Sequence, residues 1–139
     1  MKTEQRLYIQ NEWSSQDINS SAQLVLAFSS SSLVKEASSY ESLKKFYPNA
    51  DIVLTSTAGE IYDIEVNDDS ISTTALTFKN APTKAVSKEV KDVDDSFLVG
   101  EQLAKEVNTE GLKYILVFID WLCINWCDFL DGLKSVLDK

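Results

Sequence analysis

Three short apolar runs restrict most strongly how this chain can fold. They read QLVLAFS at residues 23–29, ADIVLTST at 50–57 and KYILVFI at 113–119. Each run has the length of a strand and little of the alternation seen in a strand with one wet face, so we predict three buried strands. Strands of this kind occur in sheets that are covered by helices, which favours an α/β fold.

Between and after these runs, apolar residues recur at helical spacing. A first helix is predicted at about residues 33–47, where Pro48 stops it, and a second at about 94–108, which Gly111 closes. The last element, near Trp126–Leu137, is an amphipathic helix. We therefore expect a single α/β domain, with a mixed sheet at its centre and helices packed on its faces.

Shorter alternating runs complete the predicted sheet. EIYDIEV at residues 60–66 and SISTTALTF at 70–78 are predicted strands joined by a turn at 67–69, and TKAVSKEV at 83–90 is a weaker strand. Residues 1–22 are polar, and we predict an N-terminal arm with one short strand near Leu7–Trp13. The α/β domain itself is expected to span residues 23–139.

Charge and composition argue against several classes of function. Thirteen basic residues against 22 acidic ones give a net charge of −9, which repels a nucleic-acid backbone, and no basic stripe offsets it. The chain has no histidine, and histidine is the commonest general base and the commonest metal ligand. We predict a protein that is not an enzyme, holds no metal or cofactor and binds no nucleic acid.

The N-terminal sequence indicates a cytoplasmic protein. MKTEQRLYIQNEW is charged and has no hydrophobic signal core, and two cysteines do not make a disulfide framework. The long apolar run at residues 114–133 is interrupted by aspartates and an asparagine, which argues against a membrane span.

The stretch FIDWLCINWCDF, residues 118–129, crowds two tryptophans and two cysteines together. Trp126 shares the apolar stripe of the last helix with Phe129, and we predict that both belong to the core or to an interface between chains. Trp121 lies off that stripe, and it either fills a pocket or drives self-association. Cys123 and Cys127 are interpreted as small buried apolar residues.

Four segments together resemble the N-terminal region of a FIST domain, a name that stands for F-box and intracellular signal transduction. They are QLVLAFSSSS, FYPNADIVLTSTAGEI, SISTTALTF and the LKYILVFID…DFLDGL pattern, and the most specific piece is STAGE at residues 56–60. The resemblance covers about residues 23–137. It implies a sensory domain of bacterial signalling chains that binds small molecules such as amino acids and is read out by a downstream signalling protein.

Two features depart from the family pattern. Family members carry a glycine-containing loop after the third buried strand, where this chain reads Asp120–Trp126 with tryptophan at both glycine places. The chain also covers only part of the usual N-terminal domain, so we expect a truncated or altered version of that region.

Two loops are candidates for a ligand site, because ligands of open α/β sheets bind beyond the carboxyl ends of the strands. The resemblance adds weight to the first loop, whose hydroxyls and carboxylate can bind a polar ligand with an ammonium group. The simpler interpretations are a solvated turn for the first loop and helix capping for the second. The candidate residues are Ser56, Thr57, Ala58, Gly59 and Glu60 in the first loop, and Asp120 and Asn125 in the second.

A second function is compatible with the same sequence. A truncated domain exposes apolar surface, and pairing of two chains through the tryptophan region would cover that surface. The protein would then be a non-catalytic scaffold or fragment that forms a homo-oligomer and has no surviving ligand pocket.

Overall fold

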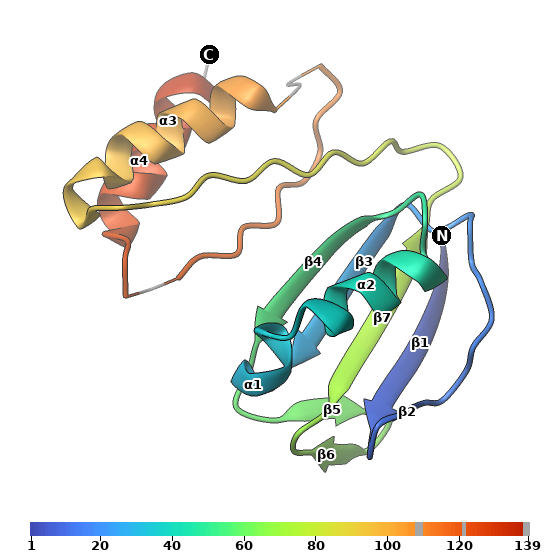
Figure 1. The fold of residues 1–139 in the computed structure, drawn as a ribbon. Coiled ribbons are helices and arrows are strands. Elements are labelled where there is room, and N and C mark those ends of the chain that lie inside the picture. The colour runs from blue at the N-terminus through green and yellow to red at the C-terminus, as the bar shows by residue number, and fades with distance from the viewer. Residues whose placement is uncertain (108–109, 121, 138–139) are drawn as a thin grey trace. The chain divides into compact units, whose positions relative to one another are not determined.

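The computed structural model describes residues 1–107, 110–120 and 122–137 (Figure 1). The chain divides into two compact units, Met1–Thr83 and Lys84–Lys139. Each unit has a hydrophobic core of its own.

A mixed five-stranded sheet forms the centre of the first unit and confirms the expected α/β class. Its strand order is β2-β1-β7-β3-β4. β3 and β4 are parallel, whereas β7 is antiparallel to both of its neighbours, β1 and β3. The strands of this sheet are β1 (Lys2–Ile9), β2 (Glu12–Trp13), β3 (Leu24–Ser29), β4 (Asp51–Ser56) and β7 (Ile71–Thr77).

A short hairpin of β5 (Glu60–Tyr62) and β6 (Glu65–Asn67) is inserted between β4 and β7. The predicted strand at 60–66 is therefore two strands, and the turn at Asp63, with a φ of 54°, separates them. The turn predicted at residues 67–69 is present and leads into β7, with Asp69 at a φ of 49°.

The N-terminal strand is longer than the sequence indicates and lies inside the sheet. β1 pairs with β7 from Lys2 to Tyr8. The chain then turns at Gln10 and Asn11, whose φ values of 53° and 65° suit a tight hairpin turn, and returns as β2. The polar residues of β1 concealed the earlier part of this strand, because the sequence gives no sign that Arg6 is buried beside Glu4, as described below.

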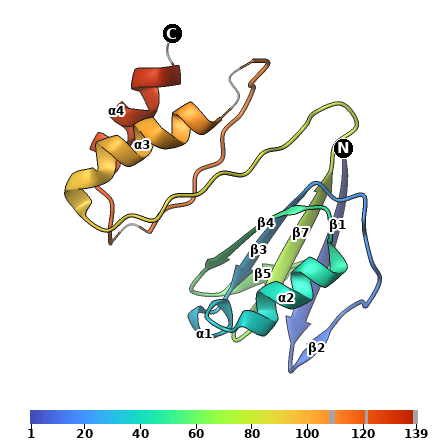
Figure 2. The ribbon, with the colours of Figure 1, turned by 45° about the horizontal axis from the view of Figure 1, so that its top comes forward.

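Two helices cover one face of this sheet, as Figures 1 and 2 show for α2. The single helix predicted at 33–47 is instead α1 (Ser31–Val34) and α2 (Ala37–Phe46), and α2 ends before Pro48 as expected. α2 presents Leu43, Phe46 and the following Tyr47 to the sheet. Alternate strand residues form the other side of the core: Val25, Ala27, Ile71 and Ala75.

A buried arginine joins β1 to α2. The side chain of Arg6 is almost fully enclosed, and its guanidinium carbon lies 4.9 Å from the ring centres of both Phe46 and Tyr47. Arg6 Nε donates to Glu4 Oε1 at 2.7 Å, and Glu4 also accepts from the Tyr47 hydroxyl at 3.2 Å and from Asn19 Nδ2 at 2.7 Å. The carboxylate and the two aromatic faces replace the water that the guanidinium loses on burial.

The contacts around Arg6 shift the pKa values of Glu4 and Tyr47. Burial acts to raise the pKa of Glu4, but the hydrogen bonds from Arg6, Asn19 and Tyr47 and the positive charge of Arg6 outweigh it, so the pKa lies below its usual value. Burial and the charge of Glu4 raise the pKa of Tyr47 to about 12, against the opposing charge of Arg6. Glu4 therefore loses its contribution to stability as the pH falls through its lowered pKa, and Tyr47 loses its contribution as the pH rises from 10.0 towards 12.

The second unit is a closely packed helix pair. A 3₁₀ turn, η1 (Val93–Asp95), precedes α3 (Ser96–Glu106), and α4 (Trp126–Leu137) has the bounds that the sequence predicts. A Cβ atom on Gly100 would collide with the carbonyl oxygen of Phe129, and one on Gly132 would collide with that of Phe97. The two helices therefore touch backbone to backbone. None of the described helices has both the length and the apolar character needed to cross a membrane.

Two of the predicted strands are wrong. Residues 83–90 and 113–119 form no strand, and neither does any other described residue of the second unit. The run at 113–119 finds no strand to pair with among the described residues of this unit. Instead, Val117 and Ile119 pack against the α3–α4 core, whereas Tyr114 is 90% exposed.

Alanine at Gly100 or Gly132 is predicted to lower the free energy of unfolding of this unit by about 1–3 kcal/mol, because the methyl group would force the helices apart. Alanine is normally the better helix former by about 1 kcal/mol, so a loss against that trend identifies the close contact. Urea unfolding measures the effect. Asp131→Ala, at an exposed position of α4, is the control. A Gly100→Ala or Gly132→Ala protein that is more stable than the unmodified chain would contradict the close contact between the helices.

Candidate functional site

The carboxyl ends of three strands meet at one edge of the sheet. β1 and β3 both run antiparallel to β7, and β4 is parallel to β3, so β1, β3 and β4 end at the same edge (Figure 1). The Gln10–Asn11 turn, α1 and the loop before β5 follow these three strands, and the turn before β7 lies at the same edge. Open α/β sheets bind their ligands at edges of this kind.

Glu60 is a buried carboxylate at this edge, with 1% of its surface exposed. Its Oε1 accepts a hydrogen bond from the Thr57 hydroxyl at 2.8 Å, and its Oε2 accepts one from the Ser70 hydroxyl at 2.9 Å. The Ser29 hydroxyl donates in turn to the Ser70 carbonyl at 3.0 Å. This network connects the end of β3, the loop after β4 and the start of β7.

The residues of the first predicted loop differ in how far they are exposed to solvent. Ser56, Thr57 and Ala58 are exposed and Gly59 is half-buried, as a solvated turn would be. Glu60 is enclosed, and both of its oxygens are occupied by hydroxyl donors. Its observed role is to hold the loop in place. The Cβ of any larger residue at Gly59 would lie 3.1 Å from Val66 Cγ1, so the loop also approaches β6 closely.

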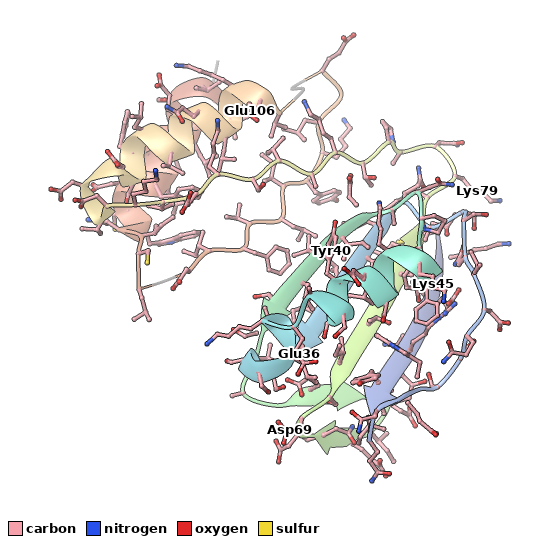
Figure 3. The ribbon with its side chains drawn as sticks, viewed as in Figure 1. Glu36, Tyr40, Lys45, Asp69, Lys79 and Glu106 are labelled. Atoms are coloured by element: carbon pink, nitrogen blue, oxygen red, sulfur yellow. The ribbon has the colours of Figure 1, made fainter. Side chains whose placement is uncertain are left out.

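A cavity of about 420 Å³ opens at the same edge. Its size suits a small molecule. Two aspartates line it and no lysine or arginine does, so its lining favours a ligand that carries a positive charge. Asp69, labelled in Figure 3, lies on the turn that leads into β7. The lining residues are Tyr8, Ile9, Gln10, Asn11, Ser32, Leu33, Asp68 and Asp69.

None of the residues that line this cavity is among the site residues that the sequence predicts. Tyr8 to Asn11 belong to the segment predicted to be an arm, and Asp68 and Asp69 were predicted only as a turn. The consecutive polar residues Asn67, Asp68 and Asp69 were the one available signal. Asn67 pairs with Glu60 across the β5–β6 ladder, and its buried Nδ2 has no acceptor among the described residues.

The second predicted loop caps a helix in the other unit. Asn125 Oδ1 accepts from the backbone N–H of Cys127 at 3.1 Å and of Asp128 at 3.4 Å, at the start of α4. Asp120 Oδ1 accepts from the N–H of Leu122 at 3.0 Å. The capping interpretation is therefore confirmed for Asn125, and Asp120 holds the turn before it.

The aromatic residues of this region agree only in part with the predictions. Trp121 lies outside the described residues. Trp126 is 46% exposed and stacks on Phe129, with ring centres 5.9 Å apart. Phe129 is 1% exposed, so the interface interpretation is wrong for this residue, which belongs to the α3–α4 core.

Cys123 and Cys127 are both exposed, so the prediction that they are buried is wrong. Cys123 follows the Asp120 turn and Cys127 lies in the first turn of α4. In the part of the chain that the structure describes, no group of three or more potential metal-binding side chains comes together.

Replacing Glu60 by alanine is predicted to lower the free energy of unfolding by about 1–3 kcal/mol, since the Thr57 and Ser70 hydroxyls lose their acceptor. Glu60→Gln keeps one acceptor oxygen and should lose less. Glu65→Ala, at an exposed position of β6, is the matched control. Urea unfolding measures all three, and a Glu60→Ala protein as stable as the unmodified chain would contradict the role of the network.

Comparison with known families gives a match that spans both units. The family model described as FIST N domain matches residues 23–139. Residues 1–22, which supply β1 and β2, precede the match. No curated protein and no solved structure matches the chain.

Proposed function

The chain belongs to the FIST N domain family of sensory domains in signal transduction, and we propose that it is a cytoplasmic, non-catalytic sensor of a small molecule. The observation that carries this proposal is the cavity of about 420 Å³ at the carboxyl edge of β1 and β3. It has the position and the size of ligand sites in α/β sheets.

The ligand that we propose is an amino acid or a similar small amine. Asp68 and Asp69 supply negative charge to the cavity, and no basic side chain in its lining compensates for it. Tyr8 and Asn11 add polar groups, and the Tyr8 hydroxyl already donates to Asn11 Oδ1 at 3.3 Å. An ammonium group near the two carboxylates would gain charge-assisted hydrogen bonds.

Signalling would follow from where the lining residues lie in the sequence. They come from the β1–β2 turn, from α1 and from the turn before β7, which are far apart along the chain. A ligand that touches all three segments favours the conformations in which they are close together. A downstream signalling protein would then respond to the change in population.

A thermal-shift screen of the 20 standard amino acids tests this proposal. A ligand at about 100 times its dissociation constant adds about 2.7 kcal/mol of stability, so a true ligand should raise the melting temperature by several degrees. Asp69→Asn, which keeps a residue that tolerates the positive φ, should reduce the shift. Asp131→Asn on α4 should leave it unchanged.

The N-acetyl derivative of each active amino acid is the chemical control. It lacks the ammonium group that the two aspartates would bind, so it should give a clearly smaller shift than the free amino acid. Equal shifts for the amino acid and its N-acetyl form, or a full shift in the Asp69→Asn protein, would contradict recognition by the aspartates.

Self-association is the second candidate function, and exposed apolar side chains of the second unit favour it. Tyr114 is 90% exposed, Leu116 64% and Trp126 46%. Pairing of two chains through these residues would remove the apolar surface from water. If no amino acid raises the melting temperature, and the mass of the protein in solution rises with its concentration, a self-associating scaffold is favoured over the sensor.

A further inference from the structure

The β5–β6 hairpin, which follows β4 (Figure 1), exposes three apolar side chains close together in the sequence. Ile64 is 90% exposed, Val66 71% and Ile61 67%. Single exposed apolar residues are ordinary at a protein surface, whereas a group of them indicates a surface that binds a partner. Ile61, Ile64 and Val66 are called the hairpin surface below.

Ile61 and Val66 share the outer face of the hairpin. They are direct partners across the ladder, and Glu60 pairs with Asn67 in the next position. Successive residues of a strand point to opposite faces, and Glu60 is buried, so Ile61 and Val66 point outward. Ile64 lies in the turn that joins the two strands.

The hairpin is held in place before any partner binds. The Ser72 hydroxyl of β7 donates to the Ile61 carbonyl at 2.8 Å, and the buried Glu60 accepts from the Thr57 and Ser70 hydroxyls. A surface that is already ordered loses little conformational entropy on binding. The exposed apolar face is therefore a fixed feature of the first unit.

Carboxylates border the hairpin surface. Asp63 and Glu65 flank Ile64 and are exposed, as is Asp68. A Cβ atom at Gly59 would lie 3.1 Å from Val66 Cγ1 and 3.9 Å from Asp68 Oδ1, so the Asp68 carboxylate is close to Val66. Within the described part of the chain, none of these three carboxylates forms an ion pair.

This charge restricts what can cover the surface. The sequence has no lysine or arginine at residues 46–78, so no basic neighbour in the sequence offsets the carboxylates. A second copy of the chain would bring the same acids against them, and an anionic membrane or a nucleic acid would also be repelled. A partner with apolar residues and a basic rim complements the surface in both respects.

We propose that the hairpin surface binds a basic amphipathic helix of a partner protein. Cross-strand partners such as Ile61 and Val66 stand about 5 Å apart, close to the rise of one helical turn. Successive turns of a helix can therefore place an apolar residue against each of them. Lysines or arginines beside that apolar stripe would pair with Asp63, Glu65 and Asp68. The proposal does not depend on a ligand in the cavity of the proposed function.

A designed peptide of leucine and lysine, with leucines at i, i+3, i+4 and i+7, is the probe for this surface. It is titrated into the full chain at an ionic strength of about 0.15 M, which screens non-specific attraction to an acidic protein. Backbone amide NMR should show saturable shifts at residues 60–67. A peptide of the same composition in scrambled order should bind at least about fivefold more weakly.

Three variants locate the binding site. Ile64→Ser removes an exposed side chain and should weaken binding of the probe by at least about fivefold. Asp63→Asn, which tolerates the positive φ, should weaken it by about threefold and reduce its dependence on salt. Ile18→Ser is the matched control, since Ile18 is 66% exposed in the loop between β2 and β3, and it should bind as the unmodified chain does.

Three results would overturn the proposal. They are equal binding of the scrambled peptide, unchanged binding by the Ile64→Ser protein, and amide shifts confined to residues outside the hairpin. A mass that rises with concentration for the unmodified chain, but not for Ile64→Ser, would also overturn it, because the occupant would then be a second copy of the chain.

Discussion

The buried guanidinium of Arg6 is the interaction on which the first unit depends. It can be accommodated only if β1 lies beside β7, if α2 places Phe46 and Tyr47 over the charge, and if Glu4 stays within hydrogen-bonding distance. Breaking one of these contacts would leave a buried charge without its partners, which is far more costly than the loss of an exposed ion pair. The cavity of the proposed function borders the strand that this charge holds in the sheet.

Where burial follows from local pattern, the sequence predicts the fold well. The helical stripe of α4 and the apolar runs of β3 and β4 can be recognised without knowing what packs against them. Only the end of β1, from Leu7, was predicted as strand, because the burial of its earlier part depends on Arg6 meeting Glu4 within the strand and two rings some 40 residues later in the chain. The run at 113–119 was predicted as a strand and is not one. Apolar residues form a strand only where a neighbouring strand can accept and donate their backbone hydrogen bonds.

The end of the sheet that carries the cavity was predictable, but the residues that line the cavity were not. The direction of the parallel strands alone indicates which edge carries ligand loops. The structural role of Glu60 was not predictable, because its second donor, Ser70, comes from the far side of the β5–β6 hairpin. For Asn125 a local motif was enough, since a side chain that caps the next helix needs only its near neighbours.

Native-state hydrogen exchange of the full chain tests most directly whether β1 is an integral strand. The amides of β1 that pair with β7 should be protected as strongly as those that join β7 to β3, since all of them should open only with the whole sheet. Exchange of the β1 amides at the rate of an unstructured peptide, with the β3–β7 amides still protected, would contradict this. β1 would then be a loose arm, and the cavity beside it would not be a stable feature of the protein.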